Sequence, residues 1–106
     1  MNPFDEPLEV QIASEIAASL GKAGRQLRTA LDNLSSYDSD VTSGKCKLDT
    51  IKRNKLVEEA AERFWSYVVQ REIIGLSDAE YIGNAYGVPQ EVWEKMGPKT
   101  TPRTKE

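Results

Sequence analysis

The chain has 106 residues, of which 29% are charged and 39% hydrophobic, and its formal net charge is −3. This length fits one domain, and no apolar run reaches the roughly 18 to 20 residues that a membrane-spanning helix needs. The slight acidic excess disfavours a general binder of nucleic acid or of membrane surfaces.

The sequence contains no histidine and a single cysteine, Cys46. It therefore lacks an imidazole base, a Ser-His or Cys-His nucleophile pair and a histidine metal ligand. A lone cysteine can neither form an intrachain disulfide nor complete a zinc site. We expect no enzymatic activity, no metal and no cofactor. The first ten residues, MNPFDEPLEV, carry acids where a secretory signal carries bases, so we expect a cytoplasmic protein.

The first predicted helix begins near Pro7. Apolar residues recur in it at intervals of three, four and seven, which indicates an amphipathic helix. They are Leu8, Ile12, Ile16, Leu20, Leu27, Leu31 and Leu34. A row of small residues, Ala13, Ala17, Gly21 and Gly24, lies beside this face. Because a glycine inside a helix costs roughly 1 kcal/mol against alanine, we interpret the row as a close helix–helix contact, within the chain or across a homodimer.

Serine, aspartate and glycine cluster in SSYDSDVTSGK, which predicts a loop from residue 35 to about residue 48. A second helix is predicted from Asp49 or Thr50 to about Ile74, with Gly75 at its C-terminal end. Two long helices joined by one loop form an antiparallel hairpin.

Two short helices are predicted after the hairpin. Ser77 and Glu80 have the spacing of a capping box, and Gly87 ends the helix that they begin. Pro89 then starts a last helix. The predicted fold is therefore all-α, a long antiparallel helical hairpin with two short C-terminal helices packed against it, in one domain over residues 1–97. The polar segment 98–106 is predicted to be disordered.

The segment 76–97 has the spacing of a DNA-binding helix-turn-helix, with Ile82-Gly83 at the crossing and a turn at Gly87. The positions expected to be exposed on its last helix are Gln90, Glu91, Glu94 and Lys95, and carboxylates repel phosphate. We therefore interpret the segment as a flap on the hairpin, with DNA binding as the alternative. The residues expected to pack are Tyr81, Ile82, Tyr86, Val88, Trp93 and Met96.

A basic stretch, KCKLDTIKRNK, covers residues 45–55. Its bases could contact nucleic acid, and they are Lys45, Lys47, Lys52, Arg53 and Lys55. The stretch has no interleaved aromatic residues for base stacking, so a solvated junction between loop and helix is the preferred interpretation. Cys46 lies within it as an exposed thiol with no resolving cysteine.

Arg71 and Glu72 follow an apolar run at the point where the chain turns. We predict that Arg71 pairs with a neighbouring element. The alternative is that Arg71 and Glu72 contact an anionic ligand or a partner protein.

The run WSYVVQRE is followed by GLSD and then by YGVPQEVWEKMG, and the first helix contains AGR. In these runs the chain resembles a family of small uncharacterised bacterial proteins, mostly from α-proteobacteria. The resemblance spans most of residues 8–97 and is weakest over residues 35–50. It implies a compact helical domain of unknown function and transfers no functional residue.

The leading hypothesis is a non-enzymatic interaction domain that forms a homodimer and binds another protein, without contact to a membrane. The alternative is a nucleic-acid-binding regulator that uses segment 76–97 or residues 45–55. An enzyme or ligand binder that uses Arg71 and Glu72 is the weakest of the three hypotheses.

Overall fold

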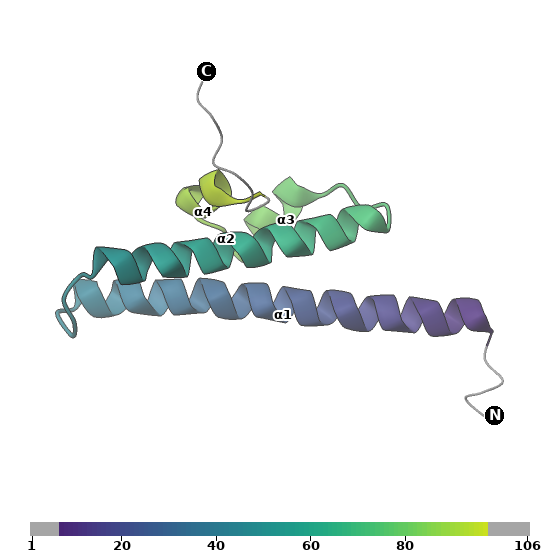
Figure 1. Ribbon diagram of the computed structural model, residues 1–106, viewed down its shortest axis with the longest axis horizontal. Helices are drawn as coiled ribbons and strands as arrows, with labels where there is room; N and C mark the ends of the chain where they lie inside the picture. Colours follow the sequence, from purple (N-terminus) through teal and green to yellow (C-terminus); the bar gives the residue numbers. More distant parts are fainter. Residues whose placement is uncertain (1–6, 98–106) are drawn as a thin grey trace, which may run out of the picture.

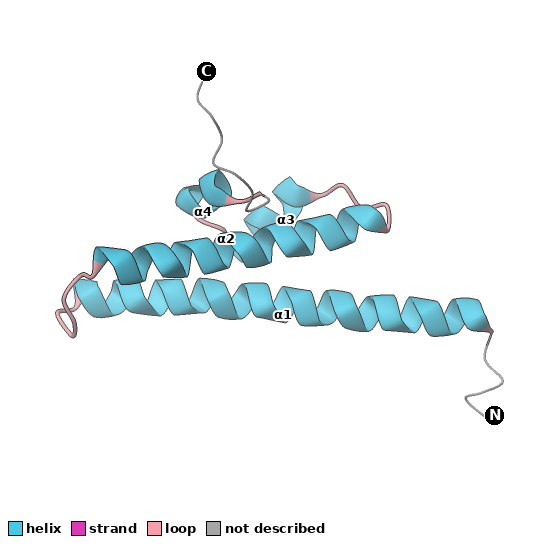
Figure 2. Cartoon of the chain, viewed as in Figure 1, coloured by secondary structure: helices cyan, strands magenta, loops and turns pink. Residues whose placement is uncertain are grey.

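The computed structural model describes residues 7–97, which form four helices without a strand (Figures 1 and 2). The helices are α1 (Leu8–Thr42), α2 (Thr50–Ile73), α3 (Ala79–Tyr86) and α4 (Gln90–Lys95). α1 and α2 run antiparallel, and the two short helices pack on this hairpin, so the predicted fold class is confirmed. The segment 98–106, predicted to be disordered, lies outside the described residues.

The hydrophobic core lies where α1, α2 and α4 meet. Its largest fully buried side chains are Leu27 of α1, Val57 and Phe64 of α2, and Val92 of α4. The ring of Trp93 meets Phe64 edge-on, with the two ring centroids 4.8 Å apart, which is a favourable geometry for aromatic rings. The core therefore fastens α4 to the middle of the hairpin.

The loop predicted from residue 35 begins later, because α1 continues through Thr42 and the loop occupies residues 43–49. Tyr37 is buried, and its hydroxyl accepts a hydrogen bond of 2.7 Å from the backbone N–H of Asp49. Asp38 forms an ion pair with Arg53 of α2. These contacts outweigh the weak helix propensity of the Ser- and Asp-rich segment, so the expected start of the loop was wrong.

Two glycines end helices as predicted. Gly75 has φ +99°, and the N–H of Leu76 reaches back 2.8 Å to the carbonyl of Arg71. Gly87 has φ +66°, and the N–H of Val88 reaches back to a carbonyl in the last turn of α3. Both positions have the left-handed conformation that glycine adopts at little cost.

The predicted capping box at the start of α3 is wrong. Asp78, and not Ser77, is the N-cap residue, and it makes no side-chain cap. Its carboxylate binds Arg71 instead, which is a stronger partner than a backbone N–H.

α3 and α4 cross closely at Gly83. A Cβ atom added there would overlap the indole of Trp93, so only glycine fits at this crossing. Of the side chains expected to pack the flap on the hairpin, Tyr81 is instead exposed. Val92 is fully buried, although the sequence pattern did not single it out.

We predict that Gly83→Ala lowers the free energy of unfolding by roughly 1 to 2 kcal/mol, because overpacking against the indole exceeds the gain in helix propensity. Urea unfolding followed by tryptophan fluorescence measures this change. Gly21→Ala is the matched control, since its Cβ meets only the mobile end of Arg25, and it should stabilise the protein by up to about 1 kcal/mol. Equal stability of the two variants would contradict the close crossing.

Candidate functional site

The apolar face of α1 continues beyond the core. Leu8, Ile12 and Ile16 are 66%, 48% and 37% exposed, and together they are called the N-terminal apolar face. α1 has 35 residues and α2 only 24, and Figure 1 shows α1 running past the end of α2. The same periodicity is therefore buried in one part of α1 and exposed in the other.

The end of α2 adds more exposed apolar side chains. The hydroxyl of Ser19 on α1 donates to Oε1 of Gln70 on α2 at 3.0 Å. From this contact, the antiparallel register places Ile16 opposite Ile73, the last residue of α2. Ile73, Ile74 and Leu76 are all exposed, so the N-terminal apolar face adjoins a second apolar surface.

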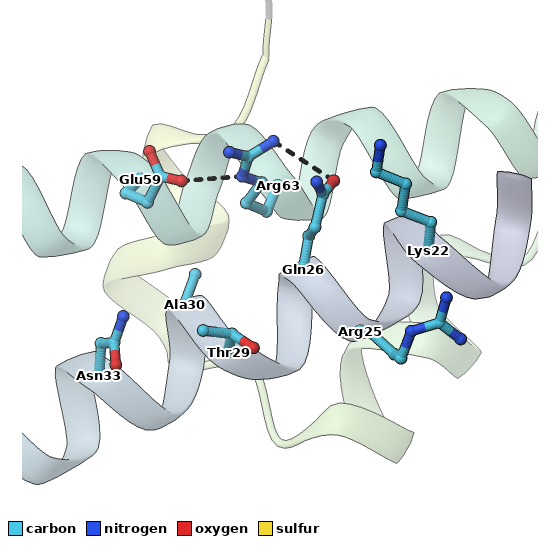
Figure 3. Close-up of a pocket in the computed structure, with 8 residues that line it drawn as sticks. All are labelled: Lys22, Arg25, Gln26, Thr29, Ala30, Asn33, Glu59 and Arg63. Atoms are coloured by element: carbon cyan, nitrogen blue, oxygen red, sulfur yellow. Dashed lines mark hydrogen bonds and ion pairs between the residues drawn. The ribbon is translucent and has the colours of Figure 1, made fainter.

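A groove of about 320 Å³ lies on the flank of α1 and α2 (Figure 3). We call it the polar groove, and it is lined by Lys22, Arg25, Gln26, Thr29, Ala30, Asn33, Glu59 and Arg63. Arg63 donates to Glu59 at 2.8 Å, the pair that the four-residue spacing favours, and to Gln26 at 3.4 Å. Lys22 and Arg25 form no ion pair within residues 7–97. The groove therefore carries uncompensated positive charge.

The row of small residues on α1 divides into two parts. Gly24 is buried, and a Cβ atom there would lie 2.9 Å from the hydroxyl oxygen of Tyr86 and 3.3 Å from Tyr67. Burial, and then the neighbouring Tyr67, raises the pKa of Tyr86. Gly24 thus lies in a close contact with Tyr67 and Tyr86 of the same chain. In the rest of the row, Ala13 and Ala17 are exposed and Gly21 is half-buried, and a Cβ atom at Gly21 would meet only the end of the Arg25 side chain.

Arg71 links the end of α2 to the start of α3. Its guanidinium binds the carboxylate of Asp78 with Nη2–Oδ2 at 2.7 Å and Nε–Oδ1 at 3.0 Å. These hydrogen bonds raise the pKa of Arg71 and lower that of Asp78. The prediction that Arg71 pairs with a neighbouring element is therefore confirmed. Glu72 is exposed and takes no part in this pair.

Arg53 joins three helices. It binds Asp38 of α1 through Nε at 2.7 Å and Nη2 at 2.8 Å, and Glu91 of α4 through Nη1 at 2.9 Å and Nη2 at 2.7 Å. Hydrogen bonds from Arg53 hold the pKa of each carboxyl below its ordinary value, and the carboxylates raise the pKa of Arg53. The guanidinium is thus occupied inside the chain. Glu91, expected to be exposed, is half-buried as its partner.

The remaining bases of residues 45–55 face solvent. Lys45, Lys47 and Lys55 are exposed, and the ammonium of Lys52 lies 5.5 Å above the ring of Tyr37. Cys46 is an exposed free thiol, as the sequence predicted. The structure therefore does not gather the five bases of this stretch into one surface, because Arg53 is turned inward.

Residues 7–97 contain neither a metal-binding cluster nor a membrane-spanning helix. No cluster of three or more acidic or cysteine side chains there is suited to hold a metal ion. None of the helices in this part of the chain combines the length and the apolar character needed to cross a membrane.

Residues 5–103 match the model of a family described as a family of unknown function (DUF6665). Comparison with curated proteins and comparison with solved structures gave no match.

We predict that Arg53→Met destabilises the fold by about 1 kcal/mol, a modest value because the carboxylates are nearly half exposed. Since Asp38 and Glu91 have lowered pKa values in the folded protein, their contribution is present at neutral pH and is lost as the pH falls below about 5. Urea unfolding at pH 7 and in acid should therefore show a smaller acid destabilisation for Arg53→Met than for the wild type.

Arg63→Met is the control for this measurement, because it removes only an exposed pair between neighbouring turns of one helix and a long, 3.4 Å hydrogen bond to Gln26. It should change stability by less than about 0.5 kcal/mol and keep the wild-type acid dependence. An acid dependence of Arg53→Met equal to that of the wild type would show that the pairs of Arg53 do not stabilise the fold.

Proposed function

The chain belongs to the DUF6665 family of unknown function, and we propose that it is a non-enzymatic protein-interaction domain that self-associates through α1. The observation that carries this proposal is the N-terminal apolar face. Its three large aliphatic side chains lie on one side of a regular helix and have no partner in the hairpin. A contiguous exposed apolar surface on a small domain is typical of an interaction site.

Burial of the N-terminal apolar face would favour association. Burying one leucine or isoleucine side chain contributes about 1.5 to 3 kcal/mol relative to full exposure. A symmetric dimer buries the face of each copy, and Ile73 and Leu76 near the end of α2 can enlarge the contact. A chain of 106 residues gains little stability from its own core, so this further burial is a large fraction of the total.

The non-enzymatic part of the proposal rests on the electrostatics. Within residues 7–97, the carboxyl groups with shifted pKa values are Asp38, Asp78 and Glu91, and in each an arginine lowers the pKa away from neutrality. A general acid or base works best with a pKa near the operating pH, so these shifts fit ion pairs that support the fold. The sequence also supplies no histidine.

Two further expectations belong to this proposal. The resemblance noted in the sequence suggests a bacterial source. The exposed thiol of Cys46 fits a reducing compartment such as the cytoplasm, where free cysteines persist.

We predict that the wild-type protein sediments as a dimer at micromolar concentration and that Ile12→Lys combined with Ile16→Lys sediments as a monomer. Two ammonium groups in an apolar contact would be buried without partners, which is strongly unfavourable. Sedimentation velocity measures the mass, and circular dichroism checks that the helices remain.

Ile51→Lys is the matched control for this experiment. Ile51 is 71% exposed, more than either changed residue, but it lies at the start of α2 near the other end of the hairpin. This variant should remain a dimer. A wild-type mass near the 11.9 kDa of one chain at every concentration would refute self-association.

The nucleic-acid alternative is less well supported by the contacts. Arg53 is held by two carboxylates, and the helix-turn-helix-like pair is packed on the core through Val92 and Trp93. Gln90 and Glu94, which face solvent on α4, contact each other at 3.5 Å and supply no positive charge. Segment 76–97 therefore presents no basic surface of the kind that phosphate contacts need, and residues 45–55 present exposed lysines without Arg53.

We predict no shift of mixed DNA or RNA in a gel at low salt, where phosphate contacts are strongest. The informative variant is Lys45→Glu with Lys47→Glu, because both side chains are exposed and changing them leaves the pairs of Arg53 intact. Tight binding by the wild type that this variant loses would favour the nucleic-acid alternative.

A further inference from the structure

We infer that the polar groove receives the N-terminal part of α1 from a second copy of this chain, and that the two copies exchange these segments reciprocally. The α1 helices then cross antiparallel, with Glu15 of one copy facing Lys22 of the other, and with Glu9 and Arg25 at the margins of the contact. This inference rests on the proposed self-association and names the surface that covers the N-terminal apolar face.

Charge is segregated along α1. From Leu8 to Ala18 the only charged residues are Glu9 and Glu15, and both are acidic. From Ser19 to Leu31 the only charged residues are bases, namely Lys22, Arg25 and Arg28. An acidic segment and a basic segment on one helix complement each other in an antiparallel pair.

The acids and bases proposed to pair between the two copies have no partner side chain within their own chain, in the residues that the structure describes. Glu9, Glu15, Lys22 and Arg25 form no hydrogen bond or ion pair with another side chain in the described part of the protein. All four are exposed. Arg28 differs, because it is paired with Asp32 at 3.6 Å and lies over the ring of Tyr86. The two acids of the N-terminal segment and the two bases Lys22 and Arg25 of the groove are therefore without side-chain partners in the described residues.

Much of both surfaces lies on one face of α1, with Glu9, Ile16 and Arg25 at its flanks. Alternating intervals of four and three residues mark a continuous seam on a helix. Such a seam runs through Leu8, Ile12, Glu15, Ser19, Lys22, Gln26, Thr29 and Asn33. The first half of the seam is apolar and acidic, and the second half lines the polar groove.

The lengths of the two surfaces also match. At 1.5 Å per residue, Leu8–Ile16 spans about 12 Å and the groove residues Lys22–Asn33 span about 16 Å. A two-fold axis beside Ser19, midway between Ile12 and Gln26, lays each N-terminal segment along the groove of the other copy.

The groove offers suitable contacts for aliphatic side chains. Ala30 is small and buried, and Figure 3 shows Lys22 and Gln26 extending from α1 toward α2. The methylene stems of Lys22 and Arg63 can cover Ile12 and Ile16 of the second copy while their charged ends stay in water. Lysine and arginine commonly pack in this way beside helical seams.

A charge-swap experiment tests the arrangement. One variant carries Glu9→Lys and Glu15→Lys, and the other carries Lys22→Glu and Arg25→Glu. Each variant alone places like charges in both contacts, so its dimer dissociation constant should rise about tenfold or more. In an equimolar mixture, the heterodimer pairs swapped acids with swapped bases in one contact and native residues in the other, and dimerisation should return.

Sedimentation equilibrium of each variant and of the mixture measures the three dissociation constants, and circular dichroism verifies folding. Lys45→Glu with Lys47→Glu is the control, because it changes charge to the same extent outside the groove, and it should dimerise as the wild type does. If the mixture dimerises no better than the variants alone, the reciprocal arrangement is refuted. If both variants dimerise normally while Ile12→Lys with Ile16→Lys is monomeric, self-association stands and this arrangement fails.

Discussion

The difference in length between α1 and α2 is the constraint on which the rest of the structure depends. A helical face is buried only where a second helix lies against it, and α2 ends at Ile73, opposite Ile16. The buried residues of α1 accordingly begin at Ala23, although the apolar periodicity begins at Leu8. The exposed part is an unbroken continuation of the core pattern, and this continuity distinguishes it from scattered surface hydrophobic residues, which need no explanation.

The second element of the architecture is the attachment of α4. This helix has six residues, too few to be stable alone, so tertiary contacts must hold it. Val92 fills the core, Trp93 packs on Phe64, and Glu91 is held by Arg53. The same contacts determine which side chains of the helix-turn-helix-like segment point toward the hairpin and which face solvent. They turn an acidic residue and two apolar residues of α4 toward the hairpin, and they occupy Arg53, one of the five bases of residues 45–55.

The sequence predicts those features that local chemistry decides. Periodicity identified the two long helices, and Gly75 and Gly87 marked helix ends because the turn needs a left-handed residue at that position. Prediction from the sequence fails where contacts with distant residues outweigh local propensity. One example is the continuation of α1 through Tyr37. Another is Arg53, whose partners lie 15 and 38 residues away in the sequence. The sequence of α1 predicts that the N-terminal apolar face is apolar. Its exposure depends on how far α2 extends along α1, and the local sequence of α1 contains no information on that.

Charge on α1 also discriminates between the ways in which two copies can pair. A parallel pair sets each residue beside its own copy, so Glu15 would face Glu15 and Lys22 would face Lys22, and like charges in contact oppose association. An antiparallel pair sets acids against bases in both halves of the contact. Such a pair has a two-fold axis and uses the same surface on both copies, so it closes after two chains and leaves no equivalent surface for a third. The segregation of acids and bases along one helix would thus favour an antiparallel dimer over a parallel one, although the apolar residues alone would fit either.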